Sequence, residues 1–103
     1  MTKKTLPMTP ARVEHHPERS RFEATVDGLV SVADYRLAGG VLRMTHTGVP
    51  SAQRGRGIAA QLVAAALEHA RREGLKVDPL CSYVRRYMQR HPQTQDLLAA
   101  PLA

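Results

Sequence analysis

The sequence predicts an α+β fold, in which a meander of three antiparallel strands is followed by a helix, a parallel strand and a second helix. Two observations indicate this fold class. Apolar and polar residues alternate between residues 22 and 47, in stretches that turn-forming pairs separate. From residue 58 onward the apolar residues recur at helical spacing instead, with one short alternating stretch between two helical ones. A strand, a helix and a strand in succession imply a crossover connection, so the last strand should lie parallel to its neighbour.

Two turns divide the predicted meander. Apolar side chains alternate over residues 22–26 and again over residues 30–37, and Asp27-Gly28 between them is a typical hairpin turn. Gly39-Gly40 then leads into a third strand over residues 41–47. The residues that share one face of this third strand are Leu42, Met44 and His46. All three are expected to point toward the core.

The second half of the chain predicts a helix over residues 58–73, ended by a glycine, and a short strand over residues 75–80. Ser82 is expected to cap a second helix, which His91-Pro92 ends. The last residues, 95–103, are compatible with a turn or with a short strand.

The length of 103 residues suits one domain, with residues 1–11 as a flexible tail and residues 12–103 as the folded part. A single cysteine permits no internal disulfide, which suits a reducing compartment. The sequence contains no signal-peptide pattern and no apolar run of the roughly 20 residues that a membrane helix needs. We therefore expect a cytoplasmic protein that does not bind a membrane.

The segment Arg54-Gly55-Arg56-Gly57 stands directly before the first predicted helix. Glycine costs backbone entropy, and arginines at this end of a helix oppose the helix dipole. The N–H groups of a first helical turn have no intrahelical acceptor, and glycine lets a ligand approach them closely. A bound phosphate would explain the segment, and a flexible loop with solvated arginines would explain it equally well.

The chain resembles the GNAT superfamily of N-acetyltransferases, because Arg54-Gly55-Arg56-Gly57-Ile58-Ala59 matches its [Gln/Arg]-x-x-Gly-x-[Gly/Ala] signature. The likeness covers roughly residues 12–98, and the whole string is similar to the short, single-domain family of YjdJ type. This resemblance implies a small GNAT-type fold, in which two parallel strands splay apart around the pantetheine arm of acetyl-coenzyme A. It also implies a binding site for acetyl-CoA, formed by Val49, Arg54, Gly55, Arg56, Gly57, Ile58, Ala59 and Ala60.

Three residues are candidates for the chemistry of acetyl transfer. Tyr87 is the candidate acid, because the superfamily places a tyrosine close to the coenzyme sulfur; Tyr83 lies one turn earlier, and both could instead be core aromatics. Cys81 follows the second parallel strand, where its thiolate could accept the acetyl group or simply line the cleft. His46 could take a proton from the incoming amine or could be a core histidine.

One position departs from the pattern of the relatives. They often carry a glutamate where this chain has Gly48, so a mechanism that uses this carboxylate as the base does not carry over. The histidines of the chain show no metal-ligand spacing with cysteine or carboxylate partners, and no metal is expected.

Three functions follow from these observations. The first is an acetyl-CoA-dependent N-acetyltransferase that acts on a small amine or a protein amino group. The second is a coenzyme A-binding module without turnover, which the missing carboxylate favours. The third is a nucleic-acid-binding domain, suggested by the net charge of +6 but disfavoured by an aromatic content of only 4% and by scattered basic residues.

The chain has too few residues before the meander to close over an acceptor. We therefore expect an open acceptor side, which suits an exposed amine, a large substrate, or completion of the site by a second subunit, as in a homodimer.

Overall fold

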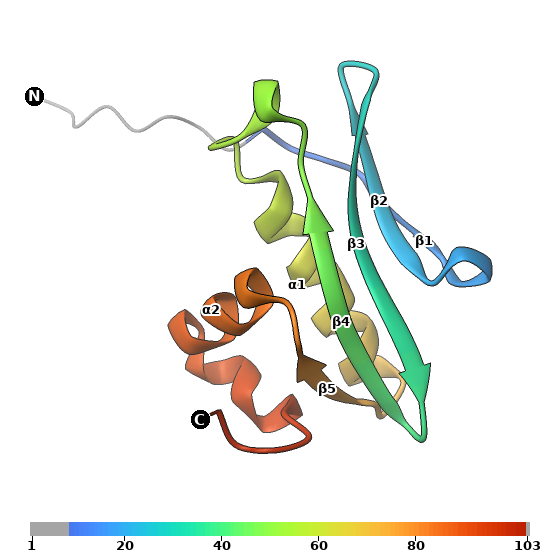
Figure 1. Ribbon diagram of the computed structural model, residues 1–103, viewed down its shortest axis with the longest axis vertical. Helices are drawn as coiled ribbons and strands as arrows, with labels where there is room; N and C mark the ends of the chain where they lie inside the picture. Colours follow the sequence, from blue (N-terminus) through green and yellow to red (C-terminus); the bar gives the residue numbers. More distant parts are fainter. Residues whose placement is uncertain (1–8, 103) are drawn as a thin grey trace, which may run out of the picture.

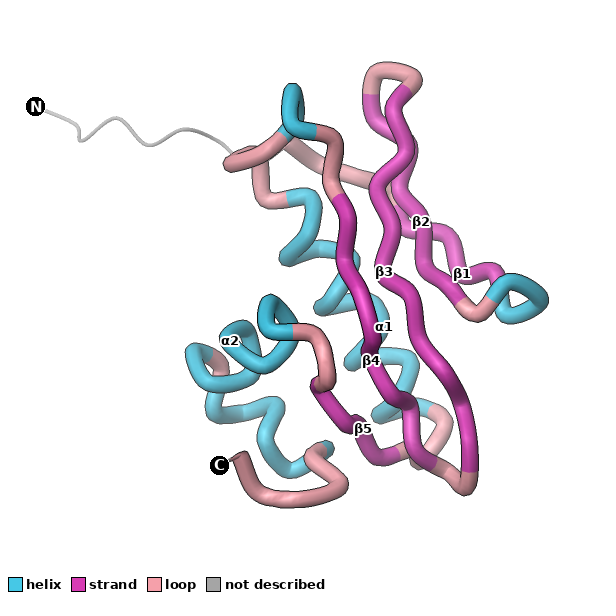
Figure 2. Tube along the Cα trace, viewed as in Figure 1, coloured by secondary structure: helices cyan, strands magenta, loops and turns pink. Residues whose placement is uncertain are grey.

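The computed structural model describes residues 9–102 and confirms the α+β fold (Figure 1). Five strands form one mixed sheet in the order β1-β2-β3-β4-β5, and only the β4–β5 pair is parallel. The helix α1 packs across one face of the sheet, and α2 lies beside β5 (Figure 2). The strands and helices are β1 Val13–His16, β2 Arg21–Val26, β3 Leu29–Ala38, β4 Val41–Gly48, α1 Ile58–Arg72, β5 Lys76–Pro79 and α2 Ser82–Arg90.

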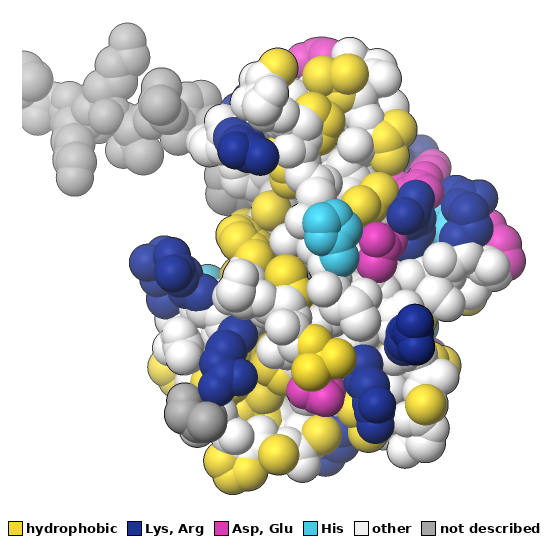
Figure 3. Space-filling view, viewed as in Figure 1, with side chains coloured by type: hydrophobic (Ala, Val, Ile, Leu, Met, Phe, Trp, Pro, Cys, Tyr) yellow, Lys and Arg dark blue, Asp and Glu magenta, His cyan; other side chains and the backbone are white. Residues whose placement is uncertain are grey.

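The core lies between α1 and the sheet face that α1 covers. Alternation along β4 buries Leu42 and Met44 completely, and the apolar stripe of α1 packs against them with the helical spacing that the sequence predicts. Burying a side chain of this size contributes about 1.5–3 kcal/mol. The opposite face of the sheet carries exposed polar and charged side chains, as the view in Figure 3 shows.

The strand β1 precedes the predicted meander and is not part of it. It pairs with β2 in antiparallel register, from Val13 opposite Ala24 to His16 opposite Arg21. Its sequence, Val-Glu-His-His, has a single aliphatic residue and therefore no apolar alternation to reveal a strand. Tertiary contacts decide its place instead, because the ring of His15 stacks on that of Phe22, with 4.1 Å between the ring centroids.

Part of the expected N-terminal tail is held against α1. The backbone N–H of Thr9 donates to the carbonyl oxygen of Arg56 over 2.9 Å, and the N–H of Ala11 donates to Oε1 of Gln61 over 2.9 Å. The side chain of Gln61 also donates to the carbonyl oxygen of Thr9, over 2.7 Å. The rest of this tail, residues 1–8, lies outside the described residues.

A β-bulge in the β3–β4 pair overturns the expected orientation of His46. Tyr35 lies opposite Met44, but its neighbour Asp34 lies opposite His46, so Thr45 is an extra residue on β4. The side chains after the bulge therefore exchange faces. His46 is exposed on the face away from α1, whereas Met44 is buried in the core.

The cap of α2 also differs from the expectation. Cys81 occupies the N-cap position with extended backbone, and Ser82 is the first helical residue, so Ser82 is not the cap. The helix ends at Arg90, before His91-Pro92, as predicted.

The C-terminal residues form a 3₁₀ helix, Pro92–Leu97, and then return to the sheet. Leu98 makes a parallel bridge with Val77, and the N–H of Ala99 donates to the carbonyl oxygen of Val77 over 2.9 Å. Arg71 of α1 anchors the segment through Asp96, with a nitrogen–oxygen distance of 2.8 Å. The sequence left residues 95–103 open between a turn and a short strand. The structure has a helical turn as far as Leu97 and then a single strand-like bridge at Leu98.

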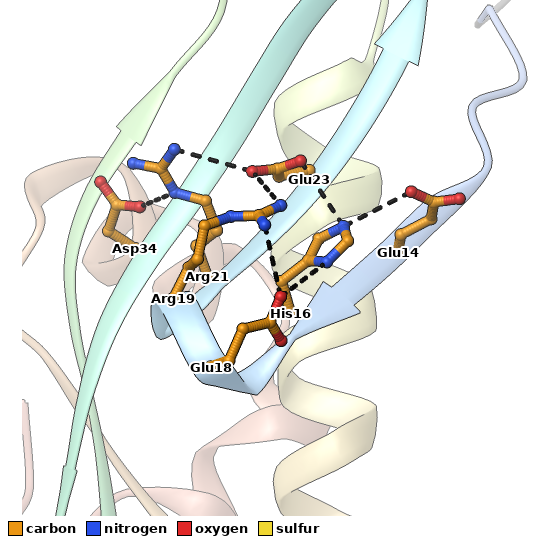
Figure 4. Close-up of polar contacts among 7 residues, drawn as sticks. All are labelled: Glu14, His16, Glu18, Arg19, Arg21, Glu23 and Asp34. Atoms are coloured by element: carbon orange, nitrogen blue, oxygen red, sulfur yellow. Dashed lines mark hydrogen bonds and ion pairs between the residues drawn. The ribbon is translucent and has the colours of Figure 1, made fainter.

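A network of charged side chains joins the β1–β2 connection to β3 (Figure 4). His16 lies 3.4–3.5 Å from the carboxylates of Glu14, Glu18 and Glu23. Glu23 also pairs with Arg19 and Arg21, at 3.1 and 3.6 Å, and Arg21 donates to Asp34 over 2.8 Å. Because these groups are partly or fully exposed to solvent, the ion pairs contribute little to the stability of the fold.

Within the described residues, no helix combines the length and the apolar character needed to cross a membrane.

His15 on β1 lies in a cluster of aromatic rings, and these surroundings disfavour the protonated form of its imidazole. Nε2 of His15 lies 2.7 Å from the hydroxyl oxygen of Tyr35, and the ring of His69 meets His15 edge-on at 4.4 Å. Burial lowers the pKa of His15 below its ordinary 6.5, and the neighbouring His69 lowers it further.

The lowered pKa of His15 makes the stability of the fold depend on pH. Below about pH 6.5 the unfolded chain binds a proton at this residue more readily than the folded chain, so the free energy of unfolding should fall as the pH falls. Urea titrations at pH 8 and pH 5.5 should show a smaller loss of stability for His15→Gln than for the wild type. Equal losses in the two proteins would contradict this assignment.

Candidate functional site

The strands β4 and β5 separate at the centre of the molecule. They pair only over residues 41–44 and 76–79, from Val41 opposite Lys76 to Met44 opposite Pro79. The N–H of Cys81 donates to the carbonyl oxygen of Met44 over 2.9 Å, and the chain then turns into α2. The remaining residues of β4, as far as Gly48, have no β5 partner. An opening therefore forms at this edge of the sheet.

A cavity of about 620 Å³ occupies this opening. It has the size and the mainly apolar wall of a small-molecule site. Its wall comes from the end of β4, the turn before α1, the first turn of α1 and one residue of α2. The lining residues are His46, Thr47, Gly48, Val49, Gln53, Arg54, Gly55, Gly57, Ile58, Ala59 and Tyr83.

The turn before α1 leaves the start of the helix without a side-chain cap. Gly55 and Gly57 have φ angles of +80° and +78°, a region that favours glycine, and Gly57 is the N-cap of α1. No side chain caps the helix, and its first turn contains no acidic residue. The N–H groups in the first turn of this 15-residue helix therefore lie at the cavity without a side-chain acceptor or a neutralising charge.

The two arginines of the turn have different surroundings. Arg54 lines the cavity, is exposed, and has no side-chain partner among residues 9–102. Arg56 points elsewhere: its Nε donates to Oγ1 of Thr9 over 2.9 Å, and its Nη2 lies 3.4 Å from Asp27. Of the two guanidinium groups expected to bind the anion, only that of Arg54 is in place. Ala60 likewise faces a different hollow, between α1 and α2.

Gln53 is a cavity residue that sequence reasoning missed. Its side chain is 2% exposed, and Nε2 donates to the carbonyl oxygen of Val26 over 2.6 Å, which ties the turn to the end of β2. Its Oε1 is buried and has no donor among the described residues. A buried acceptor without a donor is costly, so this oxygen is suited to a ligand N–H or O–H group. No periodicity marks a single buried glutamine in a short 3₁₀ turn.

Cys81 lies between β5 and α2, beside the opening, and is not among the residues that line the cavity. Its Sγ lies 3.6 Å from Oγ1 of Thr47, across the gap between β4 and α2. Burial raises the pKa of the thiol, but the amides of Val84, Tyr83 and Thr47 and the Thr47 hydroxyl outweigh burial. The pKa of Cys81 is therefore lowered, although no capping hydrogen bond of standard geometry forms at the start of α2.

His46 and Thr47 reach the cavity from the two faces of the sheet. The bulge places Thr47 opposite the buried Ala33, on the α1 side, and His46 opposite Asp34, on the exposed side. A side chain at Gly48 would put its Cβ 3.0 Å from Nε2 of His46, so the absence of a side chain leaves room for the imidazole. Residues from both faces of the sheet thus contribute to the lining of the cavity.

The structure does not place Tyr87 at this cavity. It lies six positions after Cys81, which corresponds to about 9 Å along the axis of α2. It lines the hollow between α1 and α2 instead, with its ring stacked on His91 at 3.9 Å. Tyr83, the alternative, lines both hollows. Burial raises the pKa of both tyrosines, so their hydroxyls stay protonated at neutral pH.

Among the described residues, no group of three or more histidine, cysteine or carboxylate side chains is arranged to hold a metal ion.

The environment of Cys81 predicts that the pKa of its thiol lies below the ordinary value for a cysteine. Because the chain has one cysteine, thiolate absorbance reports this group alone, and its midpoint should lie below 9.0. Thr47→Val removes a hydrogen-bond donor to the thiolate and should raise the midpoint. Thr45→Val, on the exposed face, should leave it unchanged. A wild-type midpoint at or above 9.0 would show that the amides do not stabilise the thiolate.

Comparison with known proteins assigns this geometry to a family. Residues 21–97 match the GCN5-related N-acetyltransferase family. Protein NATD1 from mouse is 38% identical over 91 residues, covering 85% of this chain and 83% of its own length. NATD1 from zebrafish is 35% identical over 92 residues, covering 86% and 84%.

The fold has a solved counterpart as well. The solution structure of a candidate GCN5-like N-acetyltransferase from Staphylococcus aureus superposes with a TM-score of 0.70. The superposition covers 88% of this chain and 90% of that one, at 24% sequence identity, and so supports the fold. With the family match over most of the chain, these likenesses show that the protein belongs to the GCN5-related N-acetyltransferase family.

Proposed function

We propose that this protein transfers the acetyl group of acetyl-CoA to an amine. One observation carries the proposal: a single cavity connects the uncapped N-terminus of α1 with the opening between β4 and β5. An anion site and a narrow apolar passage are what a thioester on a long diphosphate-bearing arm requires. Family membership supports the same reaction. Within the family we place the chain in the YjdJ-type group, on the strength of its motifs.

The residues at the cavity fit acetyl-CoA. The amides that follow Gly55 and Gly57, with the guanidinium of Arg54, would hold the diphosphate. The unpaired Oε1 of Gln53 would accept from a hydroxyl or amide group of the pantetheine arm. Cys81 and Thr47 mark the end of the passage, where the thioester would lie. The bound thioester supplies an activated acetyl group, and these residues orient it.

His46 is the group that we place on the acceptor side. It is the ionisable residue of the cavity wall that stands on the exposed face of the sheet, away from the α1 side. The neutral imidazole can take the proton that the amine loses as its nitrogen bonds to the acetyl carbon. Gly48 makes room for the ring, so this histidine replaces the carboxylate that relatives often carry there. From this exposed face an amine could reach the imidazole directly from solvent.

Acetyl transfer could follow two routes, which differ in whether Cys81 forms a covalent bond to the acetyl group. In the direct route the amine attacks the thioester carbonyl, the carbon–sulfur bond to CoA breaks, and Cys81 only lines the passage. In the covalent route the Cys81 thiolate attacks first and releases CoA, whose sulfur takes up a proton, and the amine then attacks the S-acetyl cysteine. Intact-protein mass spectrometry of reactions quenched during turnover separates them, because only the covalent route leaves an acetylated Cys81.

A coenzyme A-binding module without turnover is the alternative that the same cavity allows. Release of free thiol from acetyl-CoA that depends on added amine separates the enzyme from the binder. A panel of small amines and lysine-containing peptides should be used, because the acceptor side is open.

Arg54 should be the arginine of the turn that matters for cofactor binding. Charge reversal in Arg54→Glu should weaken CoA binding about tenfold or more, measured by isothermal titration calorimetry, because it replaces a charge-assisted bond with repulsion. Arg36→Glu makes the same charge change at an exposed position on β3 and should leave the affinity close to that of the wild type. Equal losses in both variants would mean that only the net charge matters, and the cavity assignment would be wrong.

His46 should matter for transfer but not for CoA binding. His46→Gln should lower kcat/KM for the amine by about 10²–10⁴-fold, while CoA affinity stays the same. Gly48→Ala should also slow transfer, because its Cβ would lie 3.0 Å from Nε2 of His46 and would shift the imidazole. His16→Gln, outside the cavity, serves as the matched histidine control. Unchanged kinetics in both His46→Gln and Gly48→Ala would exclude this role.

A further inference from the structure

The sheet face opposite α1 is open to solvent where β3 and β4 pair. In Figure 1 these two strands lie in front of α1, and within residues 9–102 no helix packs over this side of them. We refer to the surface as the acceptor face, because it contains His46, which the proposed function places beside the acceptor amine. Its residues on the two strands are all exposed or half-buried: Val30, Val32, Asp34, Arg36, Arg43, Thr45 and His46.

Two arginines stand opposite each other on the acceptor face without a carboxylate partner. Arg36 of β3 lies directly opposite Arg43 of β4, and both side chains are exposed. Like charges in this arrangement destabilise a pair of strands. Asp78 of β5 is in register with Arg43, but neither arginine forms an ion pair in the part of the chain that the structure describes. A carboxylate from another molecule would turn this repulsion into attraction.

The carboxylate that lies nearest to His46 in the sheet register is already neutralised. Asp34 stands opposite His46 and accepts a hydrogen bond from Nε of Arg21 over 2.8 Å. The glutamates farther along the same face belong to the network of charged side chains in Figure 4. The charge that the acceptor face leaves without a counterion is therefore positive, and it lies at the two arginines.

The other end of the acceptor face is apolar. A Cβ at Gly48 would lie 3.0 Å from Nε2 of His46 and 3.6 Å from Cγ2 of Val32, so the imidazole and this valine border the same space. Val30, the next residue of this face along β3, is 48% exposed. His46 therefore stands between two valines on one side and the arginine pair on the other.

The length of the acceptor face suits a peptide better than a small amine. From Val30 to Arg36 the strand β3 advances by about 20 Å, at roughly 3.3 Å per residue. A small amine at His46 cannot contact both ends of this surface, and small molecules bind in concave sites that enclose them. An extended peptide advances by the same distance per residue, so a short segment spans the whole face.

We propose that the acceptor is an amino group on a peptide or protein segment that carries an acidic residue, and that Arg36 and Arg43 bind this residue while the amine lies at His46. This inference rests on the proposed function, because it takes His46 to mark the acceptor side. The two arginines take no part in the bond changes of acetyl transfer. They select the acceptor and hold it along the strands.

Three peptides with blocked ends and a single lysine test the acidic preference. They differ only in the residues that flank the lysine, which are glutamate, glutamine or arginine. The wild type should acetylate the glutamate peptide with a kcat/KM about fivefold higher than that of the glutamine peptide, and the arginine peptide should be the poorest. Raising the NaCl concentration from about 50 to about 500 mM should reduce these differences, because salt screens exposed charges. Thiol release and the mass shift of the peptide measure the transfer.

The double variant R36Q/R43Q should lose the preference. Its kcat/KM values for the glutamate and glutamine peptides should agree within about twofold, and its activity on the glutamine peptide should stay close to that of the wild type, because neither arginine lines the cavity. The matched control R12Q/R72Q removes the same charge from exposed positions before β1 and on α1, and should keep the full preference. Because the preference is a ratio measured on one protein sample, partial loss of folded protein does not change it.

Three results would overturn the inference and leave the proposed function intact. These are equal wild-type kcat/KM values for the glutamate and glutamine peptides, a preference that survives in R36Q/R43Q, and a small uncharged-chain amine such as butylamine that is acetylated as efficiently as the glutamate peptide. Absence of acetyl transfer to all three peptides and to butylamine would overturn the proposed function together with the inference.

Discussion

The separation of β4 from β5 after Met44 is the constraint on which the rest of the site depends. Two parallel strands would normally continue to pair, but the amide of Cys81 takes the carbonyl of Met44 and the chain then enters α2. The last residues of β4 are thereby left without a partner on that side. This places Thr47 across a gap from Cys81, and Thr47 also lines the cavity.

Positive potential is concentrated where the fold leaves backbone donors unpaired. The first turn of α1 has no cap and no acidic residue, and Arg54 adjoins it without a counterion among the described residues. Arg86 and Arg90 extend the same potential along α2. Such arrangements lower the stability of the free protein and favour a bound anion. Part of the net charge of +6 is therefore concentrated at the start of α1 and along α2, and binding to nucleic acid is not needed to explain it.

A single extra residue in β4 decides on which face of the sheet the side chains of His46 and Thr47 lie. Strict alternation would place His46 beside Met44 in the core, as the sequence predicts. The bulge at Thr45 instead turns His46 outward and Thr47 inward, toward Cys81. Both side chains still reach the cavity, but from opposite faces of the sheet. A hydroxyl beside the thiol and an imidazole on the open side suit two different substrates that meet at one point.

The sequence by itself determined the order of strands and helices from residue 21 onward, the turn before α1 and the place of Cys81. These features depend on local patterns: alternation, helical spacing, and glycines at positive φ. Only the tertiary structure decided the existence of β1, the pairing of Arg56 with Thr9, the burial of Gln53 and the position of Tyr87 outside the cavity. Each of these depends on contacts between segments far apart in the chain, to which no local pattern is sensitive.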